Sequence, residues 1–215
     1  TVIVLYGDTP FVAPATLEMM RRRLEGDDRP GVVVLASSPA DPGAYGRVIL
    51  AGNGDRIARM VEFKDASPEE RAVRLCNSGM MAVRKDDLFH WLRQVGNANA
   101  AGEYYLPDVV MVAAAEGRHA VVVEADAWQT AGVNSRAELA TLEHEWQQRR
   151  RTQAMEGGAT LIDPATVWFS HDTQVGRDVL IEPNVFFGPG VTVHDGAVIR
   201  GFCHLEGAII GPSAE

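Results

Sequence analysis

Hydrophobic positions in the last quarter of the chain recur every six residues. A large aliphatic or aromatic side chain stands at each of these positions: Val175, Ile181, Phe187, Val193, Ile199 and Leu205. The residue that follows each of them is small or polar. An α-helix and a half-buried strand have shorter periods, so neither produces this spacing. The pattern is typical of a hexapeptide β-helix, in which three sides of short parallel strand close one triangular turn of about eighteen residues.

The preceding part of the chain alternates apolar strands with helices, which predicts an α/β sheet. Residues 1–6 are continuously apolar and predict a fully buried parallel strand. Further strands are expected at 31–36, 78–83 and 120–124, and helices at 15–24, 87–94 and 105–116. The Asn53-Gly54 step between apolar segments 48–50 and 57–62 predicts a hairpin inserted beside this sheet.

The clearest helix is expected over residues 135–153. Ser135 and Glu138 have capping-box spacing at its start. Its apolar stripe is expected to comprise Leu139, Leu142 and Trp146. The run 149–151 is all arginine, and we interpret it as a solvated helix end. We therefore expect three parts: residues 1–134 as one domain, 135–158 as a connecting helix and 159–215 as the start of the β-helix.

Charge and composition exclude several classes of partner. The net charge of −9 argues against a general nucleic-acid or anionic-membrane surface. There are only two cysteines, which suggests no disulfide framework and favours a cytoplasmic location. No apolar run approaches the roughly 20 residues that span a bilayer. The chain opens directly on a strand and stops within the repeat, so we expect a fragment of a longer protein.

Two residues at loop positions are candidate metal ligands. Asp8 follows the first predicted strand, at the edge where open α/β sheets bind ligands. Asn134 lies between the last predicted strand of the sheet and the long helix. Carboxylate and amide oxygens are hard ligands of the kind that Mg²⁺ takes. The alternatives are a helix-capping aspartate and a simple turn asparagine.

The hairpin region carries candidate sugar-binding residues. Glu62 and Asn77 come at neighbouring strand ends, where a carboxylate and an amide can accept and donate to hydroxyls. Gly46 stands beside the hairpin and would allow close approach to the backbone. An exposed hairpin charge and a turn residue are the simpler explanations of Glu62 and Asn77.

Six segments occur in an order that resembles one family. They are LYGDTP, GAYGRV, VEFKDA, NSGMMA, GEYYLPD and GVNSR, and a helix and hexapeptides follow them. Together they resemble the bifunctional bacterial enzymes that join an N-acetylglucosamine-1-phosphate uridyltransferase domain to a glucosamine-1-phosphate acetyltransferase domain. The resemblance covers essentially the whole chain. It implies a partial doubly wound, Rossmann-like nucleotidyltransferase domain followed by a left-handed parallel β-helix.

The resemblance also implies a role for each matching residue. Asp8 and Asn134 would bind magnesium. Tyr6 and Gly7 would line the nucleotide-sugar site, Gly46 would meet the N-acetyl group through its backbone, and Glu62 and Asn77 would hold sugar hydroxyls. The implied reaction is attack of N-acetylglucosamine-1-phosphate on the α-phosphorus of UTP, which yields UDP-N-acetylglucosamine and pyrophosphate for peptidoglycan and lipopolysaccharide synthesis. Acetyl-CoA would be the co-substrate of the second domain, and the intact protein would be a homotrimer.

The chain departs from the family pattern at both ends. The family's glycine-rich triphosphate loop and its catalytic basic residues would precede Thr1, and its acetyltransferase residues would follow Glu215. His194 and His204 match no catalytic histidine, and we interpret both as surface turn residues. We therefore assign no catalytic residue and expect a chain of this length to have neither activity. The alternatives are another sugar-1-phosphate nucleotidyltransferase, of adenylyl or thymidylyl type, and a non-catalytic β-helix scaffold that senses a sugar nucleotide.

Overall fold

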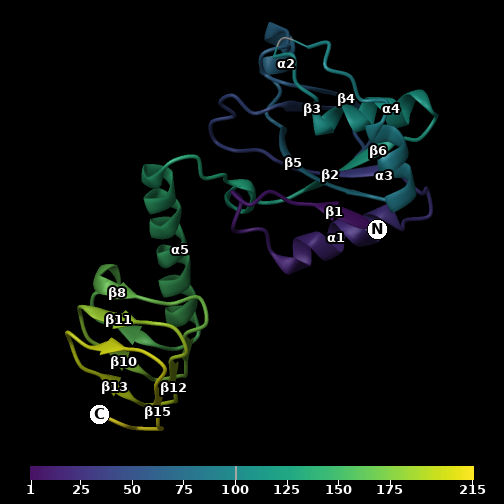
Figure 1. Ribbon diagram of the computed structural model, residues 1–215. Coiled ribbons are helices and arrows are strands. Elements are labelled where there is room, and N and C mark those ends of the chain that lie inside the picture. Colours follow the sequence, from purple (N-terminus) through teal and green to yellow (C-terminus); the bar gives the residue numbers. More distant parts are fainter. Residues whose placement is uncertain (100) are drawn as a thin grey trace. The chain divides into compact units, whose positions relative to one another are not determined.

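A computed structural model describes residues 1–99 and 101–215. The chain divides into two compact units, Thr1–Val133 and Asn134–Glu215, and each is described by itself (Figure 1). Within the described residues, no helix is long and apolar enough to cross a membrane.

The first unit is a six-stranded mixed sheet with helices on both faces. Its strands are β1 (Val2–Val4), β2 (Val32–Ser37), β3 (Arg47–Leu50), β4 (Ile57–Val61), β5 (Cys76–Val83) and β6 (Ala120–Glu124). They lie in the order β4-β3-β5-β2-β6, and β1 pairs with β5. Only β2 and β6 are parallel; the other pairs, including the predicted β3–β4 hairpin, are antiparallel.

Two separate clusters of buried side chains cover the two faces of this sheet. Helix α1 (Pro14–Leu24) packs Met20 and Leu24 against one face. Helices α3 (Lys85–Leu92) and α4 (Val109–Ala115) pack Trp91 and Val110 against the other. The short elements are α2 (Pro68–Arg71), η1 (Leu106–Asp108) and η2 (Ala127–Thr130). Burial on both faces explains why β2, which is entirely apolar except for Ser37, is buried along its whole length.

The prediction for the first strand is wrong in three respects: its direction, its burial and its end. β1 is antiparallel to β5 and only partly buried, and it ends at Val4 rather than at Tyr6. Leu5 and Tyr6 are exposed. An apolar run does not by itself report strand direction, and β1 lies along the stretch of β5 that β3 leaves unpaired. The helix expected over 105–116 also divides, because Pro107 lies in a 3₁₀ turn that precedes α4.

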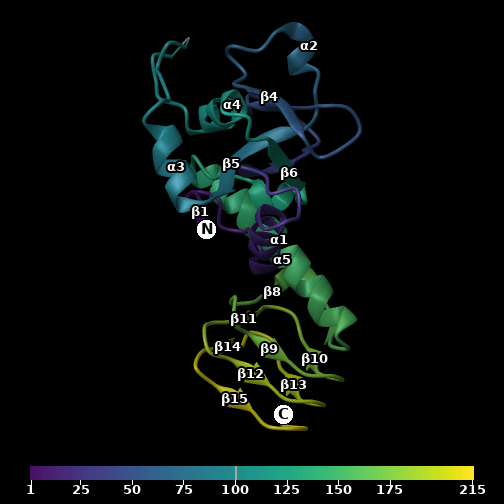
Figure 2. The same cartoon turned by 90° about the vertical axis from the view of Figure 1, so that its right-hand side faces the viewer.

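The second unit is one long helix and three small parallel sheets (Figure 2). The sheets are β7-β10-β13, β8-β11-β14 and β9-β12-β15. Their strands are β7 (Thr160–Leu161), β8 (Val167–Trp168), β9 (Gln174–Val175), β10 (Leu180–Ile181), β11 (Val185–Phe187), β12 (Thr192–Val193), β13 (Val198–Ile199), β14 (His204–Leu205) and β15 (Ile209–Ile210); a 3₁₀ turn, η3 (Pro164–Thr166), precedes β8.

The parallel strands predicted from the six-residue repeat are confirmed. Leu180 pairs with Val198 and Phe186 pairs with His204, so strands that are one circuit of the coil apart form parallel pairs. Ile181 and Phe187 are fully buried inside it. Val193 pairs with Ile210 rather than with residue 211, so the repeat loses one residue after Leu205.

Helix α5 (Arg136–Glu156) packs its C-terminal half on the first coil. Ser135 caps it by accepting from the amide of Glu138 at 3.2 Å, but Glu138 accepts from the amide of Asn134 rather than closing a capping box with Ser135. Leu142 is buried and Leu139 is exposed, so the predicted stripe is narrower than expected.

The interpretation of the arginine run as a solvated helix end holds for the exposed Arg149 but is wrong for Arg150 and Arg151, and the helix continues to Glu156. Arg151 is only 5% exposed and donates through Nε to the carbonyl of Val167 at 2.7 Å. Arg150 donates to the carbonyl of Thr173 and lies over the ring of Phe169. Burial lowers the pKa of both guanidinium groups. These arginines therefore fasten the helix to the coil.

Candidate functional site

Three of the predicted site residues lie side by side in one row across three strands. Arg47 pairs with Val61 on one side and with Cys76 on the other. In these antiparallel pairings, the next row consists of Gly46, Glu62 and Asn77. The amide of Asn77 donates to the carbonyl of Gly46 at 2.9 Å, so these two members of the row are joined by a backbone hydrogen bond. The hairpin thus brings together residues that are far apart in the sequence.

The absence of a side chain at Gly46 leaves room for the carboxylate of Glu62. A Cβ atom at Gly46 would lie 3.1 Å and 3.2 Å from the two carboxylate oxygens. Any larger residue would have to displace the carboxylate. Gly46 itself is buried, and Glu62 is partly exposed beside it. The glycine therefore fixes where the acceptor oxygens of Glu62 can lie.

Tyr6 covers the neighbouring strand. A Cβ atom at Gly79 would lie 2.5 Å from the Tyr6 ring, and Gly79 has a φ of +82°. Only glycine satisfies both requirements at little cost. The side chain of Asn77 accepts from the amide of Gly79 at 2.9 Å, which fixes the amide group beside the ring. Burial, and then the charges of Glu62 and Asp8, raise the pKa of the Tyr6 hydroxyl, so it stays a hydrogen-bond donor at neutral pH.

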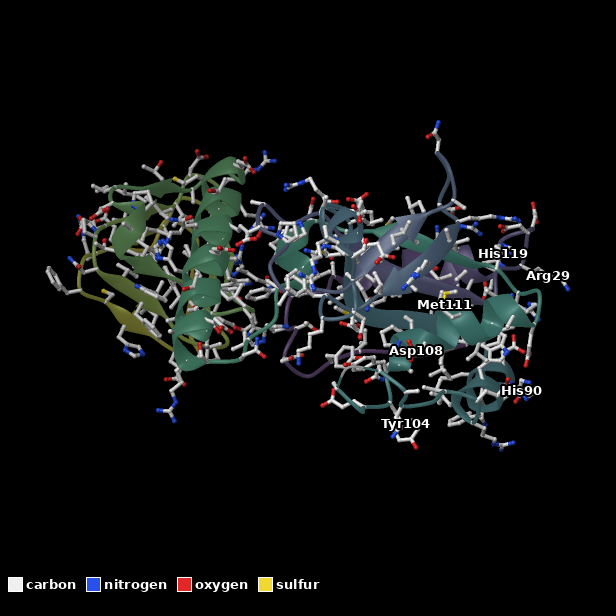
Figure 3. The ribbon with its side chains drawn as sticks, turned by 90° about the horizontal axis from the view of Figure 1, so that it is seen from above. Arg29, His90, Tyr104, Asp108, Met111 and His119 are labelled. Carbon is white, nitrogen blue, oxygen red and sulfur yellow. The ribbon has the colours of Figure 1, made fainter. Side chains whose placement is uncertain are left out.

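A cavity of about 300 Å³ opens beside Glu62. Its polar lining includes Asp65, Asn99, Tyr105 and Asp108. Asp108 lies at the start of α4, and the neighbouring Tyr104 projects into solvent (Figure 3). Burial raises the pKa of Glu62, and Asp108 and Asp65 raise it further. Burial and Asp65 likewise raise the pKa of Asp108.

Sequence reasoning missed these neighbours of Glu62. Asp65 and Asp108 belong to the motifs VEFKDA and GEYYLPD, yet neither was expected at the site. The motifs are 40 residues apart, and nothing local shows that they converge. The cavity is lined by three carboxylates, an amide, one hydroxyl and the guanidinium of Arg59, so it offers several acceptors for a hydroxyl-rich ligand.

Gly7 and Asp8 lie in an exposed turn after β1. Thr9 closes this turn by donating through Oγ1 to the carbonyl of Tyr6 at 3.0 Å. The amide of Val133 donates to the carbonyl of Asp8 at 2.9 Å, so the end of the first unit is tied to this turn. Asn134 belongs to the second unit and has an exposed side chain. The joint role of Asp8 and Asn134 therefore stays a prediction.

The two histidines that were predicted to be surface turn residues differ in their surroundings. His194 and His204 are both exposed. His204 lies in β14 rather than in a turn, and its ring packs 4.7 Å from that of Phe186. In the described part of the chain, no group of three or more histidine, cysteine, aspartate or glutamate side chains could hold a metal ion.

Comparison with known proteins identifies relatives of the whole chain. It is 54% identical over 214 residues to the protein named "Bifunctional protein GlmU" of Zymomonas mobilis, and 58% identical over 214 residues to the one of Sphingopyxis alaskensis. Each match covers 100% of this chain and 47% of the relative, so the chain spans about half the length of the relatives that it matches. The resemblance predicted from the six motifs is confirmed.

Two further comparisons concern a repeat family and a solved structure. Residues 172–207 match the family described as bacterial transferase hexapeptide (six repeats). A solved structure of CMP:2-keto-3-deoxy-manno-octonic acid synthetase complexed with CTP aligns with 68% of this chain and 61% of its own, at a TM-score of 0.50 and 19% identity. At this identity the similarity shows the fold alone.

Proposed function

We propose that this chain, a segment similar over its whole length to bifunctional GlmU proteins, forms the sugar side of a uridyltransferase site and the first coils of an acetyltransferase domain. The reaction of the first site would be in-line attack of N-acetylglucosamine-1-phosphate on the α-phosphorus of UTP. A phosphate oxygen of the sugar forms the new P–O bond, and pyrophosphate leaves with the electrons of the bond that breaks. In such transfers the protein mainly positions groups and stabilises charge.

The row Gly46, Glu62 and Asn77 is the observation that carries the proposal. It offers a backbone edge, a carboxylate and an amide within one short stretch of sheet. These groups suit an N-acetyl sugar, since its hydroxyls need fixed acceptors and its acetamide needs a close approach to the backbone. The Tyr6 ring beside them supplies an apolar wall for the sugar face.

Asp8 and Asn134 suit magnesium by their chemistry. Both side chains are exposed, and both offer oxygen donors, which Mg²⁺ prefers to nitrogen or sulfur. When bound, Mg²⁺ would neutralise charge on the phosphates. The two residues would orient the nucleotide sugar from the loop after β1 and from the start of α5.

The second unit would continue into a left-handed β-helix that N-acetylates glucosamine-1-phosphate with acetyl-CoA, and three copies would assemble through flat coil faces. One such face carries an outward row of aromatic side chains, Trp168, Phe186 and His204. Trp168 is 38% and Phe186 45% exposed, so the row is available for burial. We also propose a cytoplasmic location, as was expected from the small number of cysteines. Both cysteines are unpaired.

The test is uridyl transfer by the complete gene product, with magnesium and with UTP, ATP or dTTP. We expect UDP-N-acetylglucosamine from UTP, and about a hundredfold or greater loss of kcat/KM in Asp8→Ala and Glu62→Gln. Asp27→Ala, which changes an exposed carboxylate in the turn after α1, away from the row and from the loop before β3, is the matched control and should keep full activity. Product from ATP or dTTP in place of UTP would contradict the proposed nucleotide.

A further inference from the structure

The most deeply buried charge near the sugar site belongs to Arg47, which no step described so far uses. Its side chain is only 3% exposed. Arg47 is the first residue of β3 and follows Gly46 directly. Because successive side chains of a strand alternate between faces, the Arg47 side chain points to the face opposite to that of the site row. A guanidinium buried behind a binding site requires hydrogen-bond partners that repay its desolvation.

Backbone carbonyls supply those partners. The guanidinium donates to the carbonyls of Pro42 at 3.4 Å and Gly43 at 3.1 Å, and also to that of Tyr45. Nε donates to the carbonyl of Arg71 at 3.3 Å, beyond the hairpin. Together these bonds fold the loop before β3 around one planar cation and join it to the end of α2.

Arg47 also contacts the immediate neighbours of all three row residues. Tyr45, whose carbonyl it holds, precedes Gly46. The guanidinium lies 5.5 Å from the ring centre of Phe63, which follows Glu62. It also approaches Sγ of Cys76, which precedes Asn77, at 3.8 Å. One side chain thus reaches the three segments that present the site.

We propose that Arg47 is a positioning residue that fixes Gly46, Glu62 and Asn77 in the register needed to hold the sugar. The assignment rests on the proposed sugar site. Arg47 acts through the backbone and does not touch the substrate. Its planar fork of five donors can serve carbonyls on several sides, whereas a lysine ammonium presents its donors at one point and cannot span them.

The experiment compares steady-state kinetics of Arg47→Lys and Arg47→Met in the complete gene product, with the sugar phosphate and UTP varied separately. We expect kcat/KM for N-acetylglucosamine-1-phosphate to fall by about ten- to a hundredfold in both variants, while KM for UTP changes by less than about twofold. The loss in Arg47→Lys shows that positive charge alone does not suffice.

Arg84→Met is the matched control. Arg84 also binds two backbone carbonyls, those of Pro30 and Leu24 at 2.7 Å and 2.8 Å, but it lies at the start of α3. Its replacement should lower thermal stability. It should not change the KM for N-acetylglucosamine-1-phosphate relative to the KM for UTP.

Three results would overturn the proposal. The first is unchanged sugar-phosphate kinetics in both Arg47 variants, and the second is a parallel rise of both KM values. The third is failure of both variants to fold, since that would make Arg47 a folding residue. Lack of any uridyl transfer by the unmodified protein is a different result: it would contradict the proposed function, and the role of Arg47 with it.

Discussion

At the scale of single residues, the ionised carboxylate of Glu62 lowers the stability of the folded state. Glu62 lies partly buried next to Asp65 and Asp108, and its pKa is raised above 4.5. A raised pKa in the folded state means that the ionised carboxylate is less favourable there than in the unfolded chain. The folded state therefore loses stability as the pH rises from the unfolded pKa through the folded one.

Glu62→Gln should accordingly stabilise the first unit while it removes function. At pH 7.5 we expect its melting temperature to rise by about 1 to 4 °C, because the substitution removes an unfavourable charge. The gain should shrink as the pH falls through the folded-state pKa and vanish below the unfolded-state pKa, where Glu62 is protonated in both states. Calorimetry from pH 4 to 8 measures this difference. A Glu62→Gln melting temperature below that of the unmodified protein at pH 7.5 would contradict it.

Glu116 supplies a control of opposite sign. It accepts hydrogen bonds from Gln94, Trp91 and His90, which lower its pKa to about 2. A lowered pKa stabilises the folded state above the unfolded pKa, and the effect is lost as the pH falls toward 2. Glu116→Gln should therefore lower the melting temperature at neutral pH, where Glu62→Gln raises it.

Much of the residue-scale site followed from strand ends in the sequence. Glu62 and Asn77 were predicted because they flank neighbouring apolar segments; the structure places them in one row with Gly46, and their role stays a prediction. Asp108 was not found, because its distance from Glu62 depends on how α4 packs against the sheet. Arg47 was not singled out, since a basic residue in a hairpin is usually solvated.

At the scale of elements, α5 joins the coil through buried polar side chains as well as through Trp146 and Ala154. Gln147 is 2% exposed, and its amide group makes two hydrogen bonds to the backbone of Phe169, at 2.8 Å and 3.0 Å. Arg151 adds a bond to Val167. The sequence predicted an apolar stripe on a connecting helix, and it did not show that polar side chains such as Gln147 would be buried against the coil.

Gln147→Ala should loosen this junction. The amide and carbonyl of Phe169 would be left buried without partners, so we expect the free energy of unfolding of the second unit to fall by about 2 to 4 kcal/mol. Hydrogen exchange at the Phe169 amide should accelerate in parallel. Gln148→Ala is the control, because Gln148 is exposed and bonds only to His144 along the helix surface. Equal effects of the two substitutions on the free energy of unfolding would show that the two buried hydrogen bonds of Gln147 do not stabilise the second unit.

The elements show where patterns succeed and fail. The six-residue repeat predicted the coil because each inward position is fixed by local geometry. The direction of β1 could not be predicted, since the same apolar run suits parallel and antiparallel neighbours. The one-residue shortening after Leu205 was also invisible, because the repeat itself ends there.

At the scale of the whole molecule, the proposed trimer gives the outward aromatic row a role. Phe186→Lys would bring a charge into each of the three interfaces, so we expect the complete gene product to dissociate toward monomers. Sedimentation velocity over a range of concentrations would measure the change. Phe202→Lys is the control, because Phe202 is 85% exposed at a turn outside the row. A stable trimer of Phe186→Lys would exclude this face as the interface.

The hairpin between β3 and β4 contains a bulge that separates the site from the turn. Ile49 pairs with Arg59 but Leu50 pairs with Ile57, so Ala58 is the extra residue on β4. The row with Gly46 and Glu62 lies on the far side of this bulge from the turn. Because a bulge can absorb a change of length, insertions or deletions in the turn need not rotate Glu62 to the other face. Over evolution the turn is thus free to change length while the residues that hold the sugar keep their register.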